Sequence, residues 1–186
     1  PGPMVEAQLM ARGYTLGHFP QSFELSTIGG WVASRSSGQQ SLRYGRIEQL
    51  FAGGRIETFQ GTLDIPTFPA SSAGPDLREI LLGSEGRFGI LTDVKVRISK
   101  VAEQEEFSVV FFPSWQQASS FCREVVQQRL GLSMLRVSNA VETQTQLKLA
   151  GHEKAIHWLE RYLSLRGCDE NKCMLTFGLT GNRRQV

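Results

Sequence analysis

Two adjacent glycines follow a serine–threonine pair in the segment 23–38, FELSTIGGWVASRSSG, and this segment constrains the fold of the chain most. Ser26 or Thr27 is placed to cap a helix whose first turn contains Gly29 and Gly30. The first turn of a helix leaves backbone N–H groups without partners, and glycine leaves them uncovered. Such a helix end attracts a phosphate or an electron-rich carbonyl. The same residues also fit a capped helix packed closely on a sheet, and this segment alone favours the packing interpretation.

A second glycine segment, GSEGRFG at residues 83–89, lies between a predicted short helix and the most regular strand pattern of the chain. Asp76 is placed to cap that helix, and Gly83 is placed to end it. From residue 90 to residue 99, apolar or β-branched side chains alternate with polar ones, which predicts a strand with one wet face. The spacing G-x-x-G-x-x-G matches neither the dinucleotide-binding fingerprint nor a P-loop. Two such segments in one chain favour a ligand site over an ordinary turn.

The remaining patterns predict an α+β protein with two domains, 1–102 and 103–186. The first domain is expected to contain a helix, an extended run and two strands around a Gly53–Gly54 turn, at residues 5–12, 14–19, 47–56 and 57–65. The second is expected to form part of a ferredoxin-like sandwich, with strands at 107–112, 132–137 and 174–179 and helices at 115–128, 140–150 and 153–165.

The charge and cysteine contents argue against several classes of function. The 20 basic and 18 acidic residues are scattered and give a net charge of +2, so no surface for nucleic acid is indicated. The three cysteines include no C-x-x-C pair, which argues against a disulfide framework or a zinc site and fits a reduced compartment. No apolar run reaches membrane-spanning length. The chain is expected to be a piece of a longer protein, with a new helix beginning near residues 182–186.

Arg136 is the strongest candidate for binding an anion. It lies among apolar neighbours in the strand pattern 134–137, so its charge requires a partner. A carboxylate at a sheet edge and a bound anion fit equally well. His18 is expected to be a hydrogen-bonding loop residue, and His152 and His157 are expected at the surface. No Ser-His-Asp set, metal-ligand cluster or carboxylate pair can be identified.

Several segments together resemble the flavin domain of the vanillyl-alcohol-oxidase-type (PCMH-type) FAD-linked oxidases. They are residues 20–38, 44–48, 74–76 and 83–92, in the order and spacing of the family, and the S-T-x-G-G-W-V-A and G-S-E-G-x-x-G motifs are the most specific. The resemblance extends over residues 5–180 and is greatest to the ether-lipid synthase branch of the family.

The resemblance implies that FAD is the cofactor, held by the C-terminal lobe of an FAD-binding domain at 1–102 and followed by a truncated substrate-binding cap at 103–186. In the cap, Arg136 of the matching S-x-x-R strand would contact the substrate. The pyrophosphate loop and the catalytic Tyr/His segment of the family lie outside this chain, so no catalytic residue is assigned and no metal is implied. The implied FAD contacts are Gln21, Ser22, Phe23, Glu24, Leu25, Ser26, Thr27, Ser34, Arg35, Ser36, Ser37, Glu85, Gly86, Arg87, Phe88, Gly89, Ile90 and Leu91.

The activity implied for the whole protein is a transfer reaction. The acyl chain of an acylated dihydroxyacetone phosphate would be exchanged for a fatty alcohol, with the flavin N5 as a covalent handle. Oxidation of a 2-hydroxy acid or an alcohol, and a non-catalytic module without flavin, both stay open. Gln21 replaces the usual aspartate of the family, and Arg87-Phe88 replaces a Thr-Leu pair, which leaves the subfamily open. The whole protein is expected to be a cytoplasmic homodimer with a small-molecule or lipid-like substrate and room for peripheral membrane contact.

Overall fold

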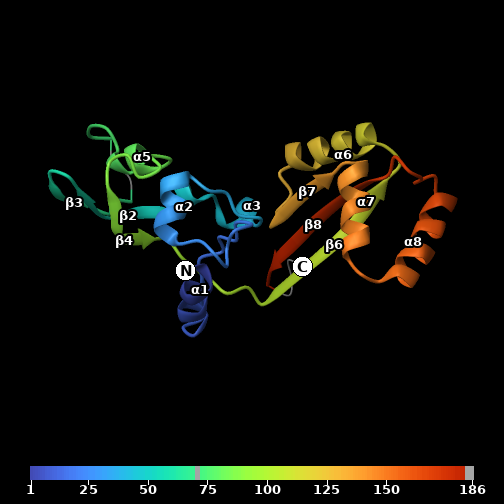
Figure 1. Cartoon of the computed structure of the whole chain (residues 1–186), viewed down its shortest axis with the longest axis horizontal. Coiled ribbons are helices and arrows are strands. Elements are labelled where there is room, and N and C mark those ends of the chain that lie inside the picture. The colour runs from blue at the N-terminus through green and yellow to red at the C-terminus, as the bar shows by residue number, and fades with distance from the viewer. Residues whose placement is uncertain (70–71, 183–186) are drawn as a thin grey trace. The chain divides into compact units, whose positions relative to one another are not determined.

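The computed structural model describes residues 1–69 and 72–182. It divides into two compact units, Pro1–Ala102 and Glu103–Val186. Each unit combines helices with antiparallel strands, which confirms the predicted α+β class (Figure 1). The loop positions 70 and 71, and most of the helix start expected near the end of the chain, fall outside the described residues.

The first unit has a three-stranded sheet in the order β3-β2-β4, and a separate pair of short strands, β1 and β5. Helices α2 and α4 contribute Trp31, Val32 and Ile47 to its main core, which also contains Leu16 and Phe51. The elements are α1 (Gly2–Met10), β1 (Tyr14–Thr15), α2 (Ile28–Ser34), α3 (Ser41–Tyr44), α4 (Ile47–Leu50), β2 (Phe51–Thr58), β3 (Gly61–Ile65), α5 (Leu77–Leu81), β4 (Ile90–Val96) and β5 (Ser99–Lys100).

The predicted helix boundaries next to both glycine segments are confirmed. Thr27 caps α2, because its Oγ1 accepts the N–H of Gly30 at 3.2 Å. Ser26 has a different role, since its hydroxyl accepts the indole N–H of Trp31 at 2.6 Å. Asp76 caps α5 by accepting the N–H of Arg78 at 2.9 Å. Gly83 follows that helix with a φ of 76°, the left-handed conformation expected of a terminating glycine.

The predicted turn at Gly53 and Gly54 is wrong. Both glycines lie inside β2, and the hairpin turn falls at residues 59–60. A Cβ atom at Gly53 would lie 2.7 Å from the carbonyl oxygen of Ile65, and one at Gly54 would lie 2.1 Å from that of Asp93. The flanking strands therefore approach the centre of β2 too closely for any side chain there, and glycine serves sheet packing rather than chain reversal.

Strand β4 is present as predicted, but its alternation is interrupted. Leu91, Val94 and Val96 pack against the cores of the first unit, whereas Ile90 is 74% exposed. The pairing of β2 with β4 shifts register after Arg55, which marks a bulge. A bulge adds one residue to one strand and moves the following side chains to the other face, so a strict period of two does not apply along the whole strand.

In the second unit, β8 lies between β6 and β7 and is antiparallel to both. Since α6 connects β6 to β7, these elements form a split β–α–β arrangement, as in a ferredoxin-like fold (Figure 1). All the helices and strands predicted for this part of the chain are present. They are β6 (Gln104–Phe112), α6 (Trp115–Gln127), β7 (Met134–Ser138), α7 (Ala140–Leu149), α8 (Glu153–Leu165) and β8 (Cys173–Gly181).

The close packing at the centre of β2 predicts a large effect of a small substitution. Gly54→Ala should lower the free energy of unfolding of the first unit by about 3 kcal/mol, because the new methyl group would overlap a backbone carbonyl of β4. Gly131→Ala is the matched control, since a Cβ there meets nothing within 4 Å. Urea unfolding of both variants measures the difference, and equal stabilities would contradict the packing role of Gly54.

Candidate functional site

The two glycine segments lie on two sides of one slot in the first unit. The slot has a volume of about 250 Å³. The first segment contributes α2 and its cap, and the second contributes the loop between α5 and β4. The lining residues are Thr27, Gly29, Gly30, Ala33, Ile56, Leu81, Ser84, Gly86, Gly89, Ile90 and Leu91. Segments more than 50 positions apart in the sequence thus face one cavity.

The second glycine segment is fixed directly to the end of α2. The backbone N–H groups of Gly83 and Glu85 donate to the carbonyl oxygens of Val32 and Ala33 at 3.1 and 2.9 Å. Carbonyl groups in the last turn of a helix need such partners. At its other end, Gly89 packs so closely on β2 that a Cβ would lie 2.1 Å from the carbonyl oxygen of Glu57. The loop is therefore held at both ends.

The walls of the slot combine open backbone with apolar side chains. A Cβ at Gly29 would meet only Leu91, at 3.6 Å, and a Cβ at Gly86 would meet nothing within 4 Å. The backbone at both positions is accordingly open to a ligand. Ile56, Leu81 and Leu91 add apolar surface. This composition suits a flat ring with an apolar face and carbonyl groups at its edge.

Only part of the implied FAD contact set lies along the slot. Thr27, Gly86, Gly89, Ile90 and Leu91 line it, whereas Arg87 and Phe88 line a neighbouring groove. The polar side chains at Gln21, Ser22 and Glu24 are exposed beside the slot segment. No local sequence signal marks Ile56 and Leu81 as site residues, because each fits an ordinary core residue of a strand or a helix.

Aromatic packing holds the segment 21–26 in place. The ring of Phe23 stacks on that of Trp31 at 6.0 Å between centroids and contacts that of Phe19 at 5.3 Å. Leu25, in contrast, is 95% exposed. A segment that anchors one aromatic side chain and exposes its polar neighbours can present those neighbours to a ligand without moving its backbone.

His18 is fully buried and supports the end of the first glycine segment. Its Nε2 is 2.7 Å from Ser36 Oγ, and its ring lies 5.1 Å from that of Trp31. This confirms the predicted hydrogen-bonding loop residue. Burial lowers the pKa of His18 from 6.5 to about 4, because the charged imidazolium would lose its hydration. The ring is therefore neutral at pH 7.

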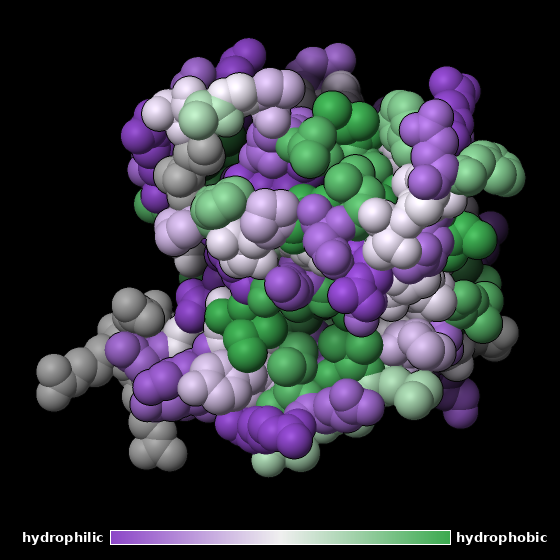
Figure 2. Space-filling view, turned by 90° about the vertical axis from the view of Figure 1, so that its left-hand side faces the viewer, coloured by the Kyte–Doolittle hydropathy of each residue, from purple (hydrophilic) through white to green (hydrophobic). Residues whose placement is uncertain are grey.

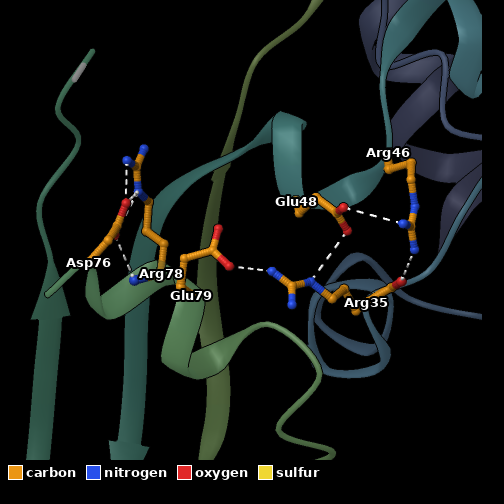
Figure 3. A network of polar contacts seen from close by, with 6 residues as sticks. All are labelled: Arg35, Arg46, Glu48, Asp76, Arg78 and Glu79. Atoms are coloured by element: carbon orange, nitrogen blue, oxygen red, sulfur yellow. Dashed lines mark hydrogen bonds and ion pairs between the residues drawn. The ribbon is translucent and has the colours of Figure 1, made fainter. Parts of the chain in front are cut away.

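Ion pairs join the end of α2 to two other helices (Figure 3). Arg35 pairs with Glu79 on α5, and its Nε lies 3.4 Å from Glu48 Oε2 on α4. Arg46 pairs with Glu48 at 3.4 Å and also donates to the carbonyl oxygen of Arg35 at 3.4 Å. Asp76 and Arg78 form a separate pair at 2.6 Å, at the start of α5. The guanidinium of Arg35 is thus engaged by carboxylates.

An apolar groove of about 530 Å³ adjoins the slot and shares Ile56 and Leu81 with it. Phe59, Leu63 and Ile80 are exposed along the groove, and apolar side chains gather on this face of the first unit (Figure 2).

In the second unit, Arg136 on β7 pairs with Glu142 on α7. The hydrogen bond from Arg136 lowers the pKa of the Glu142 carboxyl. The structure thereby supplies the carboxylate partner that the sequence left as one of two alternatives. The Arg136 side chain is still 44% exposed, so some of its N–H groups can reach another acceptor.

Comparison with known proteins places these units in a family. Residues 1–64 match the FAD binding domain family, and residues 101–186 match the C-terminal domain of FAD linked oxidases. Both matches occur in one chain and in that order, so the chain belongs to the FAD-linked oxidases, a class of flavoproteins.

Within that class, the chain is similar to an alkyldihydroxyacetonephosphate synthase of Dictyostelium discoideum, with 36% identity over 100% of this chain and 31% of that protein. An uncharacterized FAD-linked oxidoreductase of Escherichia coli (strain K12) is 32% identical over 99% of this chain and 35% of that protein. A solved structure of an alkyldihydroxyacetonephosphate synthase superposes with a TM-score of 0.87 at 35% identity, over 100% of this chain and 34% of that one. The chain thus spans about a third of the length of these relatives.

FAD is the cofactor of this class, and the slot fits a part of it. Two stretches of open glycine backbone and a set of apolar side chains that includes Ile56, Leu81 and Leu91 suit the flat ring system of the flavin. A volume of about 250 Å³ is small for a whole dinucleotide, so the slot has room for only a part of one. Within residues 1–69 and 72–182, no cluster of three or more metal-binding side chains occurs, and no helix is long and apolar enough to cross a membrane.

The buried imidazole predicts a specific pH dependence. His18 binds a proton at pH 6.5 when unfolded but only near pH 4 when folded, so the stability of the first unit should fall as the pH drops from 6.5 to 4. The loss should reach about 3 kcal/mol at pH 4, since each unit of pKa difference corresponds to about 1.4 kcal/mol. His18→Gln should remove most of this slope, and His157→Gln, at an exposed position, should keep it. The midpoint of urea unfolding is measured at several pH values by hydrogen exchange on peptides of the first unit. An unchanged pH slope in His18→Gln would assign the effect to another titrating group.

Proposed function

We propose that residues 1–102 are the C-terminal lobe of an FAD-binding domain and that residues 103–186 begin a substrate-binding cap. The whole protein would be a flavin-dependent transferase that exchanges the acyl chain of an acylated dihydroxyacetone phosphate for a fatty alcohol. The shared slot of the two glycine segments carries the cofactor part of this proposal. Similarity to alkyldihydroxyacetonephosphate synthases over the entire chain supports the substrate class.

The proposed FAD contacts fall into three groups. Residues 21–27 present polar side chains and the cap of α2 to the cofactor. Residues 34–37 would contact it through backbone groups and serine hydroxyls, since the Arg35 guanidinium is engaged elsewhere. Residues 85–91 would close over the ring, because this loop is fixed on α2 and forms the second wall of the slot.

When bound, FAD supplies the reactive centre for the exchange. The residues of this chain would position that centre and exclude water from one side of it. The apolar side chains of Ile56, Leu81 and Leu91 serve the second role, because water-poor surroundings strengthen the polar contacts made by the glycine backbone. In the cap, Arg136 would bind the substrate phosphate with the N–H groups that Glu142 leaves free.

A redox enzyme of the same class is the second candidate, because a relative that covers nearly this whole chain is named an oxidoreductase. Flavin absorbance of the full-length protein separates the two. Bleaching by a 2-hydroxy acid would favour oxidation, and bleaching by the acylated phosphate ester would favour the transferase. A full-length protein without flavin would refute both and leave a non-catalytic module. A cytoplasmic homodimer with peripheral membrane contact completes the proposal.

Filling the slot should prevent flavin binding without unfolding the protein. Gly29→Val places its Cβ at ordinary contact distance from Leu91, so the fold tolerates it, while its methyl groups occupy space in the slot. We expect the full-length variant to purify with less than a tenth of the wild-type flavin, measured by absorbance. Gly131→Val, at an open position outside the slot, should retain it. Normal flavin content in Gly29→Val would refute the assignment of the slot.

Removing the Arg136 guanidinium should weaken the binding of an anionic substrate. Arg136→Ala is expected to raise the dissociation constant by roughly 10- to 100-fold, the usual effect of losing a charge-assisted hydrogen bond. Glu142→Gln keeps the guanidinium and removes its carboxylate partner, so affinity should be preserved. Titration calorimetry with the substrate analogue measures both. Unchanged affinity in Arg136→Ala would assign this arginine to the ion pair alone.

A further inference from the structure

One arginine side chain links three separate elements around the slot. Arg35 follows α2 directly, Glu48 lies on α4, and Glu79 lies on α5 (Figure 3). Arg46 completes the group by pairing with Glu48 and by donating to the backbone of Arg35. We call these four residues, Arg35, Arg46, Glu48 and Glu79, the Arg35 clamp. Two positive and two negative charges make the clamp neutral.

The backbone at Arg35 does not favour an arginine. Its φ and ψ are 54° and 46°, the left-handed conformation that glycine adopts most readily after a helix. A non-glycine residue there has a conformational cost. The side chain can offset that cost only through stabilising contacts. Its contacts are the two carboxylates of the clamp.

Helix α5 connects the clamp to the second wall of the slot. This helix leads into Gly83, where the loop with Ser84 and Gly86 begins. The loop passes beside the arginine, since a Cβ at Gly83 would lie 3.5 Å from the Cβ of Arg35. The amides of Gly83 and Glu85 bind the carbonyls at the end of α2 in the same place. Ionic and backbone contacts therefore fix the same two elements relative to each other.

We propose that Arg35 is a positioning residue that sets the spacing between the two walls of the slot through Glu48 and Glu79. The inference rests on the proposed FAD site and assigns the guanidinium a role other than contact with the cofactor. Each exposed ion pair contributes little to stability. Several pairs at one point beside the loop can still change the population of a loop conformation several-fold, while the rest of the fold stays the same.

Arg35→Gly is the informative variant, because glycine suits the left-handed backbone while the clamp is lost. Glu79→Gln removes one ion pair from the side of α5. Arg78→Gln is the control for charge removal in the same helix. Within the described residues the Arg78 guanidinium bonds to Asp76 and to the carbonyl oxygen of Phe68, and it acts on Glu79 through charge alone. Arg35→Lys keeps the positive charge and should therefore retain part of the positioning by the clamp.

The experiment uses the full-length protein, freed of flavin and titrated with FAD. Arg35→Gly and Glu79→Gln should raise the dissociation constant of FAD by about threefold to tenfold, and Arg35→Lys should fall between them and the wild type. Without FAD, the same variants should speed hydrogen exchange in a peptide covering residues 83–85 at least threefold, while Arg78→Gln leaves both quantities unchanged. Thermal unfolding should stay within a few degrees of the wild type for every variant.

Two results would overturn the inference. Wild-type FAD affinity and wild-type exchange in Arg35→Gly would show that the clamp does not position the loop, although the proposed FAD site would stand. An equal effect in Arg78→Gln would show a general response of α5 to charge removal. If the wild-type protein binds no FAD, the proposed function fails. The hydrogen-exchange result then tests the clamp alone, and unchanged exchange at residues 83–85 in Arg35→Gly would overturn it.

Discussion

The slot depends on two backbone hydrogen bonds, from the amides of Gly83 and Glu85 to the carbonyls of Val32 and Ala33. They satisfy groups that the end of a helix cannot satisfy internally. They also join the two glycine segments, which are otherwise far apart in the sequence. Because hydrogen bonds between backbone groups fix both direction and distance, the slot follows from the way α2 ends.

Glycine has three different roles in this unit, and only one concerns a ligand. Gly53 and Gly54 allow strands to approach closely, and Gly83 ends a helix. At Gly29 and Gly86, two of the four glycines that line the slot, no such neighbour requires glycine for space.

Local chemistry made much of the fold predictable from sequence. Thr27 and Asp76 have the side chains that cap helices, and the helices α6 and α8 of the second unit follow from hydrophobic periodicity. The turn placed at Gly53–Gly54 was wrong because a glycine pair indicates equally a turn or a close contact between strands, and only the partner strands decide. The register shift in β4 is likewise set by pairing with β2.

The candidate site was predictable as two segments but not as a list of contacts. Ile56 and Leu81 reach the slot through tertiary packing, which leaves no local signal. Arg35 carries a charge that suggests a phosphate ligand in isolation, yet Glu48 and Glu79, distant in sequence, engage it. A crystal structure of the full-length protein with FAD tests the central claim most directly. We predict that the flavin ring contacts the backbone of both Gly29 and Gly86; a ring that contacts neither, or only one, would contradict a shared flavin slot.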